Sequence, residues 1–255
     1  MEPGKVNNRE FYSRFLGEDL TKLTNFCIAK QNTDLPPFHF ISAHAFVEGT
    51  KSEVLAEIYR SGKLICDSKP LSVYLSKALR IHTPHVRGTS FMRKLILTAP
   101  KGSRHYFLGG TDDTLTGIRN FIRENRGSEL TCEYNSPEFN RAWDEISPLV
   151  LDNIKSFAPN FVWVGMGAPK QFYISAEIYE KLKVTSFSVG AAFDFIAGTK
   201  QECPKFISNL GMEWLFRLIT EPRRLWRRYL IGNIEFIFYL LIDFTRHLKR
   251  DSNKL

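Results

Sequence analysis

One aspartate stands where a buried strand is predicted to end. Asp67 follows the apolar run KLIC at 63–66 and precedes Ser68, Lys69 and Pro70. A carboxylate held at a strand tip can act as a general base toward a sugar hydroxyl. Aspartate is also common in turns and caps, where its side chain bonds nearby backbone groups. The residues alone therefore leave two interpretations of Asp67, a general base and a turn or cap aspartate.

Three glycine turns follow other apolar runs, and each could bring a ligand close to the backbone. They are Gly109-Gly110 after YFL, GMGAPKQ at 165–171 after FVWV, and GAAFD at 190–194 after FSV. Glycine allows a positive φ, and free N–H groups at a following helix start attract phosphate. The turns lack both GxxxxGK[ST] and GxGxxG, so they match no standard nucleotide fingerprint. Asp194 could hold a ribose or a base edge, or it could cap a helix.

Metal and nucleophile signatures are weak in this sequence. The four cysteines are far apart and form no CxxC pair, which argues against zinc and favours reduced thiols in a cytosolic protein. They are Cys27, Cys66, Cys132 and Cys203. His82 and His85 have HxxH spacing but no third ligand at a diagnostic distance. There is also no GxSxG elbow.

The elements that must position these residues alternate between strand and helix. Strands are expected at 38–46, 63–66, 104–110, 130–134, 161–165 and 184–190. Helices are expected at 8–30, about 46–61, 89–98, 111–126, 138–157 and 171–182. Thr111 is a predicted N-cap, and Gly127 is a natural residue just past a helix end. Several strands are continuous apolar runs, so we expect an α/β, Rossmann-like fold with a mostly parallel sheet and helices on both faces.

The positive charge of the chain is concentrated near its C-terminus. The formal net charge is +8 over 255 residues, which favours a polyanionic partner. From 213 to 255 arginines alternate with aromatic and aliphatic residues, as in basic amphipathic helices. We therefore expect an α/β core at 1–212 and a C-terminal helical, amphipathic, membrane-associating appendage at 213–255. A solvated charged face and a nucleic-acid-binding surface are the alternatives, and the second lacks any helix-turn-helix or finger pattern.

Two further features bear on membranes. The N-terminus is polar and charged, so no signal peptide is expected. The most apolar stretch, 229–244, is interrupted by Asn233, Glu235 and Asp243. It is suited to lying on a bilayer rather than to crossing one.

Four segments together resemble one family. They are YFLGG (106–110), FVWVGMGAPKQ (161–171), SVGAAFDFIAG (188–198) and CPKFISNLGMEWLFRLITEPRRLW (203–226). In order and spacing they resemble the WecG/TagA/CpsF glycosyltransferases, family 26, and the likeness covers roughly 40–250. The last segment is the most specific of the four.

The resemblance implies a metal-independent, inverting glycosyltransferase without a cofactor. Such an enzyme moves N-acetylmannosamine, its uronic acid or glucose from a UDP-sugar to a sugar on a polyprenyl diphosphate. It works as a peripheral protein at the cytoplasmic face of the cell membrane, in surface or extracellular polysaccharide synthesis. Partners would be the UDP-sugar, the lipid-linked acceptor and the membrane surface, not nucleic acid, and homo-oligomerisation stays open.

The resemblance also assigns roles to residues. Asp67 corresponds to the proposed general base. Gln171 corresponds to a substrate-contacting position and Asp194 to a position near the nucleotide. Together with the strand-end glycines Gly109, Gly110, Gly165 and Gly167, they are the residues that we expect to bind the donor. The arginines that close over the diphosphate correspond to Arg217, Arg224 and Arg227. On the acceptor side the corresponding positions are Ser42, His44 and His85.

The departures from the family pattern gather on the acceptor side. Ser68 replaces the glycine after the aspartate, Ser42 ends a segment where an asparagine is usual, with His44 as a substitute, and His85 opens an altered Arg-Val-x-Gly block. They leave a second interpretation open, in which the chain is a catalytically degenerate homologue that acts as a membrane-bound scaffold or binding module.

Overall fold

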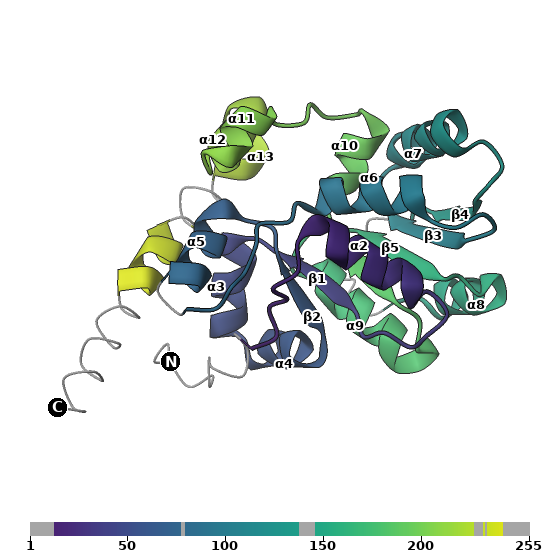
Figure 1. Ribbon diagram of the computed structural model, residues 1–255, viewed down its shortest axis with the longest axis horizontal. Coiled ribbons are helices and arrows are strands. Elements are labelled where there is room, and N and C mark those ends of the chain that lie inside the picture. Colours follow the sequence, from purple (N-terminus) through teal and green to yellow (C-terminus); the bar gives the residue numbers. More distant parts are fainter. Residues whose placement is uncertain (1–12, 78–79, 138–145, 227–231, 233, 242–255) are drawn as a thin grey trace.

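Six parallel strands form a sheet at the centre of the protein. The computed structural model describes residues 13–77, 80–137, 146–226, 232 and 234–241 (Figure 1). The strands are β1 (Phe38–Ile41), β2 (Lys63–Cys66), β3 (Arg104–Gly109), β4 (Thr131–Asn135), β5 (Phe161–Gly165) and β6 (Ser186–Ser188). Their order in the sheet is β2-β1-β6-β5-β3-β4, and all neighbours pair in parallel. The predicted Rossmann-like α/β class is confirmed.

The helices connect these strands in the expected alternation. Before the last strand they are α2 (Leu20–Ala29), α3 (Ala43–Lys51), α4 (Glu53–Ser61), α5 (Lys69–Lys77), α6 (Gly88–Thr98), α7 (Asp112–Arg126), α8 (Pro148–Phe157) and α9 (Lys170–Leu182). After it come α10 (Ala192–Ala197), α11 (Lys205–Asn209), α12 (Glu213–Thr220) and α13 (Pro222–Trp226), and residues 234–241 are also helical. As predicted, Thr111 caps α7 by accepting a hydrogen bond from the Thr114 amide, and Gly127 ends it.

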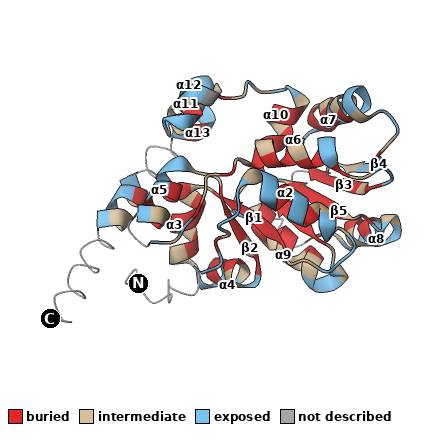
Figure 2. Ribbon diagram, viewed as in Figure 1, coloured by how far each residue is buried: buried red, intermediate tan, exposed pale blue. Residues whose placement is uncertain are grey.

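Both faces of the sheet are buried under helices. Helices α2, α6, α7 and α10 cover one face, and α4, α8 and α9 cover the other (Figures 1 and 2). Side chains of β5 point alternately to the two faces. Phe161 and Trp163 pack into the hydrophobic core under the first group of helices, and Val162 and Val164 pack into the core under the second group. This double burial explains why the strands are apolar runs rather than alternating ones.

Several predicted boundaries were wrong for local reasons. The helix expected at 8–30 begins only at Leu20, after the Asp19 side chain caps it, and Phe15 instead lies beside β2 in an extended segment. The strand expected at 38–46 ends at Ile41, because Ser42 caps α3. The single helix expected at 46–61 is two helices, because Ser52 caps α4.

One other boundary was too generous, because the last strand covers only Ser186–Ser188 of the expected 184–190. Of the helix expected at 138–157, helix α8 confirms Pro148–Phe157, and residues 146–147 are not helical. Residues 138–145 lie outside the described part of the chain, so a helix there stays a prediction.

The C-terminal part of the chain, from α11 onward, is attached to the core in two ways. Helices α11–α13 form a group that a connecting segment joins to α10 (Figure 1). Further on, Phe236 and Tyr239 make edge-to-face contacts with Phe46 of α3 and Tyr74 of α5. Phe236 is only 5% exposed, so aromatic packing fixes the helix at 234–241 on the core.

Candidate active site

Asp67 is held rigidly at the tip of β2. Its amide donates to the Ile41 carbonyl of β1, and its Oδ1 accepts a 2.9 Å hydrogen bond from the Gly88 amide at the start of α6. The side chain is half-buried and faces two cavities. The strand tip and the helix start therefore fix the carboxylate without covering it.

The surroundings of Asp67 favour its protonated form. Burial, and then the nearby carboxylate of Glu213, raise the pKa of Asp67 to about 7. The Gly88 hydrogen bond and the cations Arg87 and Arg217 act in the opposite direction. A carboxylate with a pKa near neutrality can both take up and release a proton, which suits a general base.

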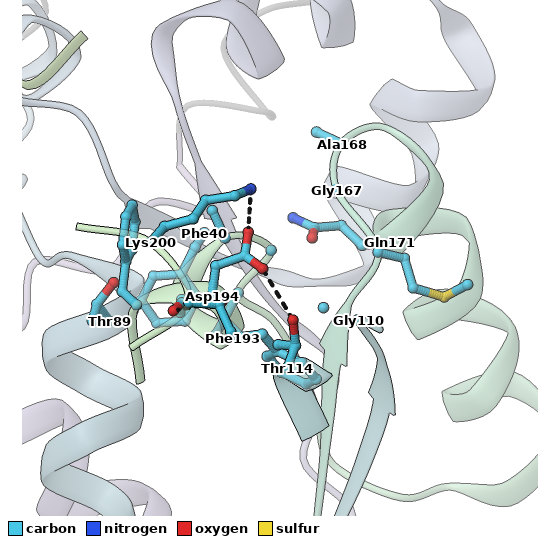
Figure 3. A pocket seen from close by; sticks show the side chains of 18 of the residues that line it. Phe40, Thr89, Gly110, Thr114, Gly167, Ala168, Gln171, Phe193, Asp194 and Lys200 are labelled. Atoms are coloured by element: carbon cyan, nitrogen blue, oxygen red, sulfur yellow. Dashed lines mark hydrogen bonds and ion pairs between the residues drawn. The ribbon is translucent and has the colours of Figure 1, made fainter. Parts of the chain in front are cut away.

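The larger of the two cavities lies beyond the carboxyl ends of β3, β5 and β6. It measures about 600 Å³, and it is lined by Gly110, Gly165, Gly167, Gln171 and Asp194 together with arginines from the C-terminal segment. Gly109, which was also expected to bind the donor, does not line it. In an open parallel sheet this edge is where ligands bind. Because residues that are expected to bind the donor line it, we call it the donor cavity. Figure 3 shows Gln171 and Lys200 pointing toward one another within it.

The glycines of the turn after β5 serve two different purposes. A Cβ on Gly165 would lie 2.5 Å from the ring of Phe193, so this glycine leaves room for packing. Gly167 has φ +78° and open space around the missing side chain. Only Gly167 therefore fits the expectation of a turn that exposes its backbone to a ligand.

Gln171 is an almost fully buried polar side chain on the donor cavity. It is 4% exposed, and its Nε2 donates to the Ser188 carbonyl of β6. Its Oε1 is buried and has no hydrogen-bond partner among the described residues. An unsatisfied buried acceptor is costly, so this oxygen is ready to accept an N–H or O–H group from a ligand.

Asp194 does not cap a helix, which removes one of its two interpretations. It lies in the first turn of α10, where no side chain makes a capping hydrogen bond. Its carboxylate instead accepts a 3.4 Å bond from Thr114 Oγ1 and pairs with Lys200 at 2.6 Å (Figure 3). Lys200 also lines the cavity, and sequence reasoning missed it.

Two of the three expected arginines reach the donor cavity. Arg217 of α12 and Arg224 of α13 both line it, and Arg217 lies over the ring of Phe195 at 5.5 Å. The Nε atom of Arg217 is buried without a partner among the described residues. Arg227 lies outside the described residues.

Arg87 is a second cation that sequence reasoning did not assign. Its guanidinium pairs with Glu213 of α12 and with Glu202, each at 3.1 Å, and it lines the donor cavity. Arg87 therefore joins the start of α12 to the start of α6. Its position in the block HVRG, between Asp67 and a predicted helix, was the available signal.

A second cavity of about 300 Å³ lies on the other side of Asp67. The three residues assigned to the acceptor side, Ser42, His44 and His85, all line it. The two cavities share Ser42, Asp67, Glu213 and Arg217. We call the smaller one the acceptor cavity; Asp67 and Arg217 stand where the two meet.

The acceptor cavity combines polar groups with an apolar wall. Trp214, Phe236, Ile237 and Leu240 supply the apolar part. Burial, together with the nearby cations Arg87 and Lys69, lowers the pKa of His85 to about 4, so this histidine is neutral at pH 7. Ser42 is partly committed to the fold, because its hydroxyl accepts from the Ala45 amide at the start of α3.

The outer side of the C-terminal segment is rich in exposed apolar groups. Between half and two-thirds of Ile234, Ile237, Phe238 and Leu241 is exposed, and Ile219 and Trp226 add to them. No helix in the described part of the chain is long and apolar enough to cross a membrane.

One group of residues in the described chain could surround a metal ion. His44, Glu48 and Glu235 have ligand atoms within 4.8 Å of one another. Lys51 already pairs with both glutamates, at 3.6 Å and 2.9 Å. The group joins α3 to the C-terminal helix, and Glu48 and Glu235 line neither cavity.

Comparison with known proteins gives a family and a relative. Residues 18–250 match the model of the family described as "Glycosyl transferase WecG/TagA/CpsF family". One similar protein is the "N-acetylglucosaminyldiphosphoundecaprenol N-acetyl-beta-D-mannosaminyltransferase" of Bacillus spizizenii, 34% identical over 82 residues. That alignment covers 32% of this chain and 32% of the relative, so the chain spans about a third of the length of the curated relative it matches.

Proposed function

This chain belongs to the WecG/TagA/CpsF family of glycosyltransferases, and from that premise we propose that it transfers a sugar from a UDP-sugar to a polyprenyl-diphosphate-linked sugar. The name of the Bacillus relative favours N-acetylmannosamine as the sugar and an N-acetylglucosaminyl lipid as the acceptor. The uronic acid of N-acetylmannosamine and glucose are the other candidates. One observation supports the proposal most directly: Asp67 lies between two cavities that share it.

In this mechanism the donor occupies the larger cavity and the acceptor sugar occupies the smaller one. The open acceptor Gln171 Oε1 binds a hydroxyl or N–H group of the donor. The backbone at Gly167 lets the diphosphate approach closely. Trp214 lines the second cavity, and its flat ring can pack against the acceptor sugar.

Asp67 then acts as the general base of an inverting displacement. Its carboxylate takes the proton of the attacking acceptor hydroxyl, whose oxygen forms a bond to the anomeric carbon as the bond to the UDP oxygen breaks. Negative charge grows on the departing diphosphate. Arg217 and Arg224 face that charge from the cavity wall, and their guanidinium groups can pair with phosphate oxygens in a two-pronged geometry.

The apolar wall of the acceptor cavity suggests where the lipid lies. Phe236, Ile237 and Leu240 line the cavity, and the same helix exposes Phe238 and Leu241. We propose that this helix rests on the bilayer surface at the cytoplasmic face, so that the polyprenyl chain runs from the membrane along it to the site. The 213–255 segment would then bring cations and lipid to Asp67 together.

The test is a panel of UDP-sugars offered with a polyprenyl-diphosphate-linked monosaccharide in vesicles, with products identified by mass. We expect one UDP-sugar to add a single residue to the lipid acceptor. Addition of EDTA should leave the rate unchanged if arginines alone offset the leaving charge.

The departures Ser42, Ser68 and His85 favour the second candidate, a catalytically degenerate homologue that scaffolds polysaccharide assembly. All three line the acceptor cavity. That candidate predicts binding of the lipid acceptor with no transfer and no donor hydrolysis from any UDP-sugar. A product in the panel would exclude it.

A further inference from the structure

A single glutamate oxygen holds two cations of the donor cavity. Glu221 Oε2 lies 3.2 Å from Lys200 Nζ and 3.0 Å from Arg224 Nε. Lys200 and Arg224 both line the cavity, although they come from different segments of the chain. Two cationic donors that converge on one oxygen are a common way for proteins to bind a phosphate oxygen.

The local charges are balanced without a ligand. Lys200 also pairs with Asp194 at 2.6 Å, so two carboxylates offset the two cations of this group. Lys200 and Glu221 are about one-quarter and one-fifth exposed, so water screens their interaction only in part. An incoming diphosphate, with its higher charge, would compete with the Glu221 carboxylate for both cations.

The two cations differ in how they can move. Lysine carries its charge on a flexible four-carbon stem, so Nζ can shift toward a ligand while Asp194 still bounds it on the other side. Arg224 is more than half exposed, and its guanidinium is free to rotate toward the cavity once Glu221 releases it. Neither movement requires a change in the backbone.

Resting on the proposed function, we propose that Lys200 and Arg224 form a phosphate subsite for the donor, and that Glu221 occupies this subsite in the ligand-free protein. The carboxylate oxygen stands in for a phosphate oxygen. Binding of the UDP-sugar exchanges one anion for another at the same two cations. Lys200 is then a donor-binding residue, and Glu221 is an internal competitor of the donor.

The test uses two neutralising substitutions in the same ion pair and measures UDP binding to the full chain by calorimetry. Lys200→Met should weaken UDP binding roughly tenfold, because a charge-assisted contact is lost. Glu221→Gln should tighten it roughly two- to fivefold, because the internal competitor loses its charge. An ion pair that serves only to hold the fold together would give changes of the same sign, or none.

Three controls keep the result specific. Lys200→Arg keeps the charge and should bind UDP within about twofold of the wild type. Glu129 also pairs with two cations, Lys101 through Oε1 and Arg126 through Oε2, and these residues line neither cavity, so Lys101→Met and Glu129→Gln should not change UDP binding. Uridine, which has no phosphate, should bind all variants alike.

The outcomes separate this inference from the proposed function. If the wild type fails to bind UDP, the proposed donor is wrong, and the proposed phosphate subsite for that donor is wrong as well. If the wild type binds UDP but Glu221→Gln weakens binding, or Lys200→Met leaves it unchanged, the subsite is wrong and the proposed function stands.

Discussion

The donor side of the core and helix α12 hold their functional groups in opposite ways. Around the glycine turns, Gln171 and Phe193 are almost fully buried, and tight packing leaves no room for a Cβ at Gly165. Helix α12 has no buried residue, although it carries Arg217. Ion pairs hold its two ends instead: Arg87 binds Glu213 at its start, and Lys200 binds Glu221 just beyond its end.

This difference indicates that the two regions have different roles in the site. The Asp67 carboxylate and Gln171 Oε1, which we propose act as base and as donor-binding acceptor, stand on a strand tip and on a helix packed against the sheet. Arg217, which we propose meets the charge of the departing diphosphate, stands on a helix whose ends are held by ion pairs. Substitutions in the two regions test this contrast.

Substitution of Asp67, the proposed general base, should have the largest effect on transfer. Asp67→Asn keeps the acceptor for the Gly88 amide but cannot take a proton, so we expect transfer to fall by about 10²–10⁴-fold. UDP affinity should stay close to that of the wild type. Transfer is followed by product mass and UDP binding by calorimetry; an active Asn variant would remove Asp67 from the proposed role.

Substitution of Arg217, which lines both cavities, should have the second-largest effect on transfer. Arg217→Gln should raise the barrier by about 2–4 kcal/mol, by analogy with the loss of one oxyanion donor. The circular dichroism and melting temperature should barely change, because α12 contributes no buried residue. A large drop in melting temperature with an unchanged rate would show that Arg217 has a structural role instead.

The tight packing on the donor side of the core is tested by adding a methyl group at Gly165. Gly165→Ala places a methyl group 2.5 Å from Phe193, and overpacking of this kind costs about 1–3 kcal/mol. Urea unfolding measures the loss. Gly165 has no positive φ, so its cost is expected to be steric. Gly102→Ala gives the opposite case for comparison, because Gly102 has φ +81° and no atom within 4 Å of the added methyl group, so its cost is backbone strain without a collision.

The raised pKa of Asp67 gives a pH dependence with a definite sign. Because the carboxylate must be ionised to act as a base, kcat/KM should rise about tenfold per pH unit below pH 7 and level off above it. Stability should move the other way. A carboxyl whose folded-state pKa is raised binds its proton more tightly when folded, so the free energy of unfolding falls as pH rises from about 4 to about 7.

Asp67→Asn supplies the control for both effects. The stability difference between wild type and variant, measured by urea unfolding at several pH values, should change only across this window. A pH-independent difference would mean that burial does not shift the Asp67 pKa as described.

Much of this site follows from strand ends in the sequence. Asp67, Gly167 and Gln171 were found because parallel strands bring their carboxyl ends to one edge, and that geometry needs only the order of elements. The resemblance to the family added Arg217 and Arg224. The structure brings all of these to two adjoining cavities.

The partners of charged residues could not be predicted in this way. Lys200 and Glu221 are twenty-one positions apart, and nothing in their spacing shows that one carboxylate oxygen meets two cations. The role of Gly165 was also hidden, because its steric partner Phe193 lies in a distant segment. Helix boundaries failed where a capping serine, Ser42 or Ser52, overrode the apolar pattern.

The smallest predicted effect is that of salt, which should loosen helix α12 but not the packed sheet and its covering helices. Partly exposed ion pairs contribute about 0–1 kcal/mol each and weaken as ionic strength rises. Limited proteolysis at low and high salt should therefore show faster cleavage around α12 at high salt, while the sheet and its covering helices stay resistant. Glu213→Gln removes the pairing with Arg87 and should make cleavage fast at both salt concentrations. Equal resistance of α12 under all these conditions would mean that its contacts with α11 and α13, rather than the ion pairs at its ends, keep Arg217 at the site.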